Sequence, residues 1–385
     1  MNDDQFTADN WGNPPYNRRS FQHVQALFPT TRLRRGPGPV LDLATATRDI
    51  SRLEYTGTAG TKSIRQMLDD TFTDAFLVLH NDVIICEEYD NGMRPDSHHL
   101  LNSVTKTFVG MLAGILIDEG LLDPEQKIAH YMPEFHTTAF ANTSLRHALD
   151  MTAAVSFGED YADPQADFWK ETAVVGWRPA LVNDELPSTL LKFALSLQET
   201  EQNDGDGFHY RTVLTNLIAM TIERVTDQRI QNLLEVRIWE KLGAEQDAVI
   251  VVDRTGFPYV GAGMNACARD LARFGQLLLH DGQLNGTQIV PARWIHDTLE
   301  ASDSCRTHFA ATDYTQMLPG GQYRNQVWGV RDEGVMICIG IYGQTIYVDQ
   351  THDVVMVKLS THSQPVDNEL FGDTFAAMRA VCHAL

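Results

Sequence analysis

Short apolar runs bounded by polar turn residues lie near both ends of the chain and have the composition of β-strands. Near the N-terminus, residues 75–79 and 83–89 flank His80-Asn81-Asp82, which predicts a hairpin with a short turn. Near the C-terminus, four such runs with turn residues between them cover 326–330, 335–342, 345–350 and 354–360. Both ends of the chain are therefore expected to form β-structure.

Between these runs, apolar residues recur at helical spacing. The most apolar helix is predicted over 98–122, where Phe108, Leu112 and Ile115 would share a buried face and Gly120 would cap the C-terminus. Further helices are predicted over 143–152, 188–198, 213–226, 229–241, 267–280, 291–300 and 369–384. Strands at both ends and helices in the middle predict an α+β protein.

The expected architecture is an antiparallel sheet assembled from the N- and C-terminal parts of the chain and flanked by helices, with a mostly helical region inserted. We expect residues 1–122 and 266–385 to form one region and 123–265 the other, with the active site between them. Residues 1–40 are predicted to be an extended arm with one short helix around 21–28. Residues 153–187 lack periodicity and carry several aromatic residues, which fits either the wall of a pocket or a packed surface loop.

Two residues at the start of the 98–122 helix have complementary chemistry. Ser103 and Lys106 are three positions apart and would share a helix face. A serine hydroxyl needs a nearby base to become a good nucleophile, and a buried lysine can be that base because desolvation lowers its pKa. The alternative is a serine that caps the helix and a lysine on its solvated side.

Composition and charge narrow the function classes. The chain has 385 residues, of which 43% are hydrophobic and 21% charged, as in ordinary globular proteins. Its net charge of −21 argues against nucleic acid and anionic membrane surfaces as partners. The acidic, polar start has no secretory signal pattern and no apolar run approaches a membrane-spanning length, so the expected location is the cytoplasm.

Metal and phosphate sites are not indicated by the sequence. The five cysteines are scattered and form no Cys-x-x-Cys pair, which indicates neither a disulfide framework nor a zinc site. His98 and His99 belong to no metal-ligand pattern and are expected at the surface. The glycine-rich segment 256–263 lacks the lysine of a phosphate-binding loop. No cofactor is therefore expected.

Three motifs in order resemble the serine β-lactamase and penicillin-binding-protein superfamily, in its class C and esterase branch. Ser103-Val104-Thr105-Lys106 follows a predicted hairpin and opens a buried helix, Tyr210 precedes the helix over 213–226, and residues 338–349 are similar to the third motif strand. Further segments (WGNPPYNRRSFQHV, GEDYADP, GFPYVGAG, GIYGQ) are similar to the 6-aminohexanoate-dimer (nylon-oligomer) hydrolase subfamily. The resemblance implies a β-lactamase-like fold.

The resemblance also implies a catalytic machinery. It makes Ser103 the nucleophile, Lys106 the base that takes its proton, and Tyr210 the residue that relays a proton to the leaving group. The backbone N–H groups of Ser103 and Ile341 would form the oxyanion hole. Tyr210 could instead be a core tyrosine whose hydroxyl is satisfied elsewhere.

Two further residues are implied to bind substrate. Tyr161, in GEDYADP, matches the subfamily residue that contacts the scissile amide nitrogen, and Trp328 matches a tryptophan that lines the cleft. The alternatives are an ordinary loop tyrosine and a tryptophan that only packs.

The chain departs from the superfamily pattern at two motifs. Thr212 stands where the tyrosine motif usually has asparagine, and the third motif reads Cys338-Ile339-Gly340 in place of a cation, threonine and glycine. That cation and hydroxyl would bind the carboxylate of a β-lactam or peptide, so their loss argues against β-lactamase or carboxypeptidase activity as the main function. The nylon-oligomer hydrolases also lack them.

The resulting expectation is a serine hydrolase that works through an acyl-enzyme on linear 6-aminohexanoate oligomers or short-chain esters, with a small-molecule substrate and no metal or nucleotide. The rivals are a carboxylesterase with little amidase activity and a catalytically inactive binding protein on the same scaffold. The resemblance leaves the oligomeric state open, with a homodimer as one option.

Overall fold

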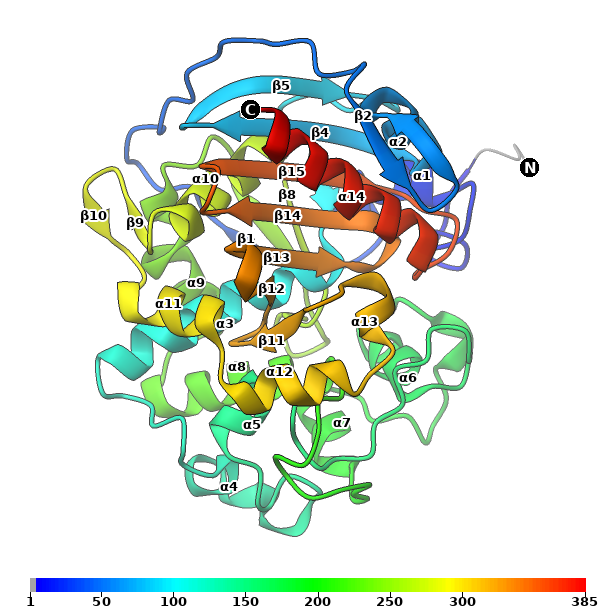
Figure 1. The fold of residues 1–385 in the computed structure, drawn as a ribbon. Helices are drawn as coiled ribbons and strands as arrows, with labels where there is room; N and C mark the ends of the chain where they lie inside the picture. The colour runs from blue at the N-terminus through cyan, green and yellow to red at the C-terminus, as the bar shows by residue number, and fades with distance from the viewer. Residues whose placement is uncertain (1–4) are drawn as a thin grey trace.

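A seven-stranded antiparallel sheet forms the centre of the computed structural model, which describes residues 5–385 (Figure 1). Residues 1–4, the start of the predicted arm, lie outside the described part. In spatial order the strands are β11 (Gln322–Arg324), β12 (Val327–Val330), β13 (Val335–Gly340), β14 (Gln344–Asp349), β15 (Val354–Ser360), β4 (Thr73–His80) and β5 (Val83–Tyr89). All six strand runs predicted from the sequence belong to this sheet.

The sheet joins the two ends of the chain as predicted. β15 pairs with β4, with Val357 opposite Leu77, so C-terminal and N-terminal strands share one ladder. β4 and β5 form the expected hairpin, in which Asn81 and Asp82 have φ values of 48° and 64°. Left-handed conformations at both central residues match the right-handed twist of the flanking strands. The predicted α+β class is confirmed.

Helices cover both faces of the sheet. The C-terminal α14 (Asn368–Ala384) crosses the front of the sheet in Figure 1, and α10 (Ala268–Leu279) packs against β14, β15 and β4. Gly275 permits this close approach, because a Cβ there would lie 2.3 Å from Val355. The apolar α3 (Thr105–Asp118) runs below the sheet, against α8 (Val213–Thr226).

The remaining elements surround this core. A second, four-stranded sheet has the order β1 (Thr30–Leu33), β7 (Ala248–Val251), β8 (Met264–Ala266) and β6 (His99–Leu100). Two small hairpins are β2 (Glu54–Gly57) with β3 (Gly60–Ser63), and β9 (Gln283–Leu284) with β10 (Thr287–Gln288). The other α-helices are α1 (Asn17–Ser20), α2 (Ile64–Asp70), α4 (Ile128–Tyr131), α5 (Leu145–Leu149), α6 (Asp167–Val174), α7 (Leu190–Ser196), α9 (Ile230–Arg237), α11 (Ala292–Glu300), α12 (Asp303–Ala310) and α13 (Tyr314–Met317).

The predicted helix over 98–122 starts too early. His99–Leu100 is strand β6, paired with β8, and Asn102–Val104 is a 3₁₀ turn (η2) that leads into α3. The chain enters this turn through Asn102 in a left-handed conformation with φ of 47°. At the other end Gly120 has φ of 73° directly after the C-cap residue Glu119, as expected of a glycine that ends a helix.

The N-terminal arm is packed against the protein, with a helix arrangement that differs from the prediction. The prediction of a helix over 21–28 is wrong, because α1 ends at Ser20 and the only helical turn in 21–28 is the 3₁₀ turn Val24–Ala26 (η1). Trp11 is buried in the arm and packs edge-on against Phe28 and Trp177. Burial of this aromatic surface fixes the arm beside the irregular 153–187 segment. The division into 1–122 with 266–385 and 123–265 stays a prediction.

Candidate active site

Ser103 and Lys106 meet where η2 leads into α3. The Lys106 ammonium donates to Ser103 Oγ at 2.7 Å, to Thr212 Oγ1 at 3.0 Å and to the carbonyl oxygen of Gly261 at 2.7 Å. Ser103 is 8% exposed and Lys106 only 1%. The alternative of a capping serine and a solvated lysine is therefore wrong for the lysine, which lies inside the protein.

Burial makes Lys106 hold its proton less tightly than an ordinary lysine does. Desolvation lowers its pKa to about 8, while the carboxylates of Glu159 and Glu171 act in the opposite direction. An amine with a pKa near 8 is partly neutral at physiological pH and can accept a proton from Ser103.

Glu159 is linked to Lys106 through Thr212. Thr212 donates to Glu159 through its hydroxyl at 2.6 Å and through its backbone N–H at 2.5 Å. The hydroxyl of Tyr161 donates to the same carboxylate at 2.8 Å. Burial raises the pKa of Glu159, whereas Lys106 and these three hydrogen bonds act to lower it. Thr212 therefore accepts from the lysine and donates to the glutamate, in the position where the superfamily has asparagine.

A second buried carboxyl group supports the other side of the lysine. Asn216 donates to Glu171 at 3.0 Å and accepts from the backbone N–H of Gly261 at 3.1 Å. The Gly261 carbonyl, in turn, accepts from Lys106. Burial raises the pKa of Glu171 to about 8. These contacts orient the loop that supplies the main-chain acceptor for the lysine.

The aromatic ring of Tyr210 faces the ammonium group of Lys106. Its ring centroid lies 5.0 Å from the Lys106 ammonium and 5.3 Å from the Trp328 ring. Burial and the charge of Glu159 raise the pKa of Tyr210 well above its usual value, and a hydrogen bond with Ser103 acts against this rise. Tyr210 is thus a protonated phenol beside the Ser103 hydroxyl at neutral pH, able to give a proton and take one back.

The segments that carry Ser103 and Ile341 are tied together. The amide group of Asn102 donates to the Ile341 carbonyl at 3.0 Å. Gly340 allows the two backbones to touch, since a Cβ there would lie 2.4 Å from the carbonyl oxygen of Leu101. Tyr342 is held in a left-handed conformation with φ of 64°, which non-glycine residues rarely adopt. The loop after β13 is therefore constrained relative to Ser103.

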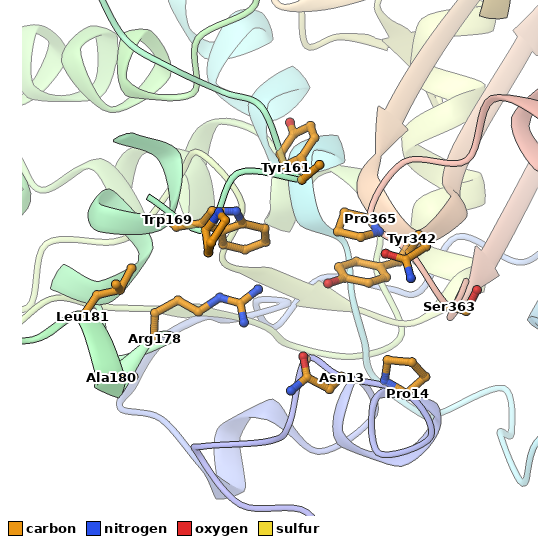
Figure 2. Close-up of a pocket in the computed structure, with 14 residues that line it drawn as sticks. Asn13, Pro14, Tyr161, Trp169, Arg178, Ala180, Leu181, Tyr342, Ser363 and Pro365 are labelled. Carbon is orange, nitrogen blue, oxygen red and sulfur yellow. The ribbon is translucent and has the colours of Figure 1, made fainter. Parts of the chain in front are cut away.

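One cavity brings five of the six sequence-predicted residues together. Its volume is about 60 Å³, and its wall includes Ser103, Tyr161, Tyr210, Trp328 and Ile341. The sixth, Lys106, lies beneath Ser103. Tyr161 also lines a larger neighbouring cavity of about 420 Å³, which Figure 2 shows with Trp169, Arg178 and Tyr342 around it. The 153–187 segment thus forms a pocket wall.

Several residues of the site were not predicted from the sequence. Glu159 stands two positions before Tyr161, and alternate residues of an extended segment point to the same side, so this spacing could have indicated it. Glu171, Asn216 and Gly261 carry no local signal, because their contacts with one another and with Lys106 are formed only by the tertiary fold.

The third motif and the histidines also have defined places. Cys338 is buried and does not line the cavity, whereas Ile339 does, so an apolar wall replaces the cation and hydroxyl of the superfamily. The predicted surface position is wrong for His99, which is fully buried and forms a hydrogen bond with Asp74 at 3.1 Å. All five cysteines are free and buried. Within residues 5–385, no group of three or more His, Cys, Asp or Glu side chains could hold a metal ion.

Comparison with known proteins supports the resemblance seen in the motifs. A family model described as Beta-lactamase matches residues 61–378. A 6-aminohexanoate-dimer hydrolase from Paenarthrobacter ureafaciens is 35% identical over 364 residues, which cover 93% of this chain and 89% of that protein. A candidate 6-aminohexanoate-dimer hydrolase from Bacillus anthracis superposes with a TM-score of 0.89 at 28% identity, covering 99% of this chain and 97% of that one.

The fold is shared more widely. A family VIII carboxylesterase superposes with a TM-score of 0.58 at 16% identity, over 82% of this chain and 97% of that one. At this identity the likeness concerns the fold alone. The predicted β-lactamase-like architecture is confirmed. In the described part of the chain, no helix has both the length and the apolar character needed to cross a membrane.

Proposed function

The chain belongs to the Beta-lactamase family and is a hydrolase of that family, and from this premise we propose that it cleaves amides or esters through an acyl-enzyme on Ser103. The observation that carries the proposal is the 2.7 Å contact between the Ser103 hydroxyl and a buried lysine whose pKa is lowered to about 8. This pair supplies a nucleophile and its base without a cofactor.

Acylation begins with attack of Ser103 Oγ on the carbonyl carbon of the substrate. Lys106 takes the hydroxyl proton, and the developing oxyanion is bound by the backbone N–H groups of Ser103 and Ile341. The C–N or C–O bond then breaks, and Tyr210 delivers a proton to the leaving amine or alcohol, while Lys106 returns a proton to Tyr210. A water molecule attacks the acyl-enzyme by the same route and regenerates Ser103.

Tyr161 and Trp328 are proposed to hold the substrate. Both line the cavity at Ser103, and Tyr161 carries a hydroxyl that can contact the scissile amide nitrogen, as implied by the resemblance. The apolar wall at Ile339 offers no cation for the carboxylate of a β-lactam. We therefore propose linear 6-aminohexanoate oligomers and short-chain esters as substrates, in line with the relative that is 35% identical.

The experiment that tests this proposal compares the purified protein with Ser103→Ala on the 6-aminohexanoate linear dimer and on p-nitrophenyl butyrate. Ser304→Ala is the matched control, because Ser304 is an exposed serine outside the cavity wall. We expect turnover of both substrates, lost in Ser103→Ala and kept in Ser304→Ala. Ester turnover alone would favour the carboxylesterase rival, and turnover that survives in Ser103→Ala would refute the proposed nucleophile.

A carboxylesterase depends less on Tyr161, because an alcohol leaves more easily than an amine. If ester cleavage were unchanged in Tyr161→Phe and the dimer were not cleaved by the parent protein, the esterase assignment would stand. The inactive-scaffold rival requires that a fluorophosphonate probe, which phosphonylates nucleophilic serines with loss of fluoride, leaves Ser103 unlabelled by mass spectrometry.

A further inference from the structure

The larger cavity beside Tyr161 contains one fixed charge. Among the described residues that line it, Arg178 is the only side chain with a formal charge at neutral pH, and its other polar side chains include Asn13, Ser363 and Gln364. The chain as a whole carries 51 acidic and 30 basic residues, so a cavity with only a cation is unusual for this protein.

Arg178 is held in place by aromatic groups. Its guanidinium carbon lies 3.9 Å from the centroid of the Trp169 ring, and Figure 2 shows the group directed toward the hydroxyl of Tyr342. Stacking on an aromatic face orients the planar guanidinium and leaves its N–H donors free along the edge. Burial lowers the pKa of Arg178, and its interaction with Tyr342 acts in the opposite direction.

No carboxylate of residues 5–385 forms an ion pair with Arg178. The acidic residues of the neighbouring loop have other partners. Asp160 and Asp163 accept hydrogen bonds from the backbone N–H groups of Ala162 and Gln165, and neither lines the cavity. A partly buried guanidinium without a carboxylate partner has unused donors that suit a bidentate anion.

The larger cavity adjoins the smaller cavity at Ser103. Tyr161 belongs to both cavities, and Tyr342 directly follows Ile341 of the proposed oxyanion hole. The cavity at Ser103 has room for about 60 Å³ only, so most of a substrate must lie in the larger one, on the side of Tyr161. Because Tyr161 is proposed to contact the scissile nitrogen, this side receives the leaving group.

We infer that Arg178 is the residue that selects substrates by the charge of their leaving group, because it binds a carboxylate at the far end of the leaving amine or alcohol. The inference rests on the proposed function, since it assumes that Ser103 is the nucleophile. Trp169 holds the guanidinium, and Tyr342 adds a hydroxyl donor beside it. A neutral amide end group would offer these donors one uncharged acceptor oxygen in place of the two oxygens of a carboxylate.

The kinetic test uses matched substrates that differ only in this charge: the acetate ester of 6-hydroxyhexanoate and that of its N-methylamide. We expect the parent protein to favour the carboxylate by about 10- to 100-fold in kcat/KM, the range for a hydrogen bond to a charged group. In Arg178→Gln that ratio should fall toward one. Arg94→Gln, which removes an exposed cation outside the cavity wall, should keep it.

A binding measurement separates this inference from the proposed function. In Ser103→Ala, calorimetry with N-acetyl-6-aminohexanoate and its N-methylamide should show at least about tenfold tighter binding of the carboxylate, lost on adding Arg178→Gln. The inference would be overturned by equal affinities of the two amides in Ser103→Ala together with equal kcat/KM values of the two esters in the parent protein, even if Ser103 cleaves p-nitrophenyl butyrate. Carboxylate selectivity in binding without Ser103-dependent turnover would uphold it and refute the nucleophile instead.

Discussion

Glu159 should control the pH at which the enzyme becomes active. In the proposed mechanism Lys106 must be neutral to take the proton of Ser103, so kcat/KM should rise with pH through the lysine pKa of about 8. Glu159→Gln removes the negative charge that this carboxyl group carries when ionised, and it keeps the shape of the side chain. A nearby carboxylate favours the ammonium form, so its removal should lower the lysine pKa. The rise in kcat/KM with pH, which is the acidic limb of the pH profile, should then move to lower pH.

The size of the shift follows from two hydrogen bonds. Thr212 Oγ1 lies 3.0 Å from the Lys106 nitrogen and 2.6 Å from a Glu159 oxygen. At a charge separation of about 5 Å and an effective dielectric constant of about 20, the attraction is about 3 kcal/mol. Since one pKa unit corresponds to about 1.4 kcal/mol, the acidic limb should move to lower pH by up to about 2 units.

The assay is kcat/KM for p-nitrophenyl butyrate between pH 5 and 9, corrected for spontaneous hydrolysis at each pH, with circular dichroism to verify folding. Asp160→Asn is the matched control, because it removes an exposed charge from the adjacent position, whose carboxylate bonds only its own loop. Its limb should coincide with that of the parent protein. An unmoved limb in Glu159→Gln, or one that moves to higher pH, would refute the electrostatic coupling.

Three further changes test the lysines and the packing of α3. Lys106→Arg should reduce ester and amide turnover by about 10²- to 10⁴-fold in steady-state assays, because a guanidinium cannot give up its proton to act as a base; turnover within a few-fold of the parent would exclude Lys106 as the base. Gly110→Ala should lower the free energy of unfolding by about 1–3 kcal/mol in urea titrations, since its Cβ would lie 2.1 Å from the Asn325 carbonyl oxygen and main chain cannot easily yield; unchanged stability would contradict this contact. Burial lowers the pKa of Lys358 from 10.5 to about 7, so between these values the unfolded chain binds more protons and the free energy of unfolding rises with pH, by up to about 1.4 kcal/mol per pH unit. Lys358→Met should reduce that slope between pH 7 and 10, and an identical slope would show that the lysine is not desolvated.

Local sequence patterns were sufficient for the elements and for the central pair of the site. The hairpin at Asn81-Asp82 and the four C-terminal strand runs depend on short-range composition and turn chemistry, and all lie in the observed sheet. The i, i+3 spacing places Ser103 and Lys106 side by side in any helical turn, which is why their contact could be predicted without a fold. The start of the helix could not, because the β6–β8 pairing that ends before Asn102 is a long-range interaction.

The sequence by itself thus determined the α+β class, the family resemblance and the pair of residues proposed as nucleophile and base. The tertiary structure alone decided the environment that lowers the pKa of Lys106. Its partners Thr212 and Gly261 lie 106 and 155 positions away along the chain, and desolvation depends on everything packed around the amine. The same holds for the proposed role of Arg178, which depends on the absence of a carboxylate partner, a property that no local pattern encodes.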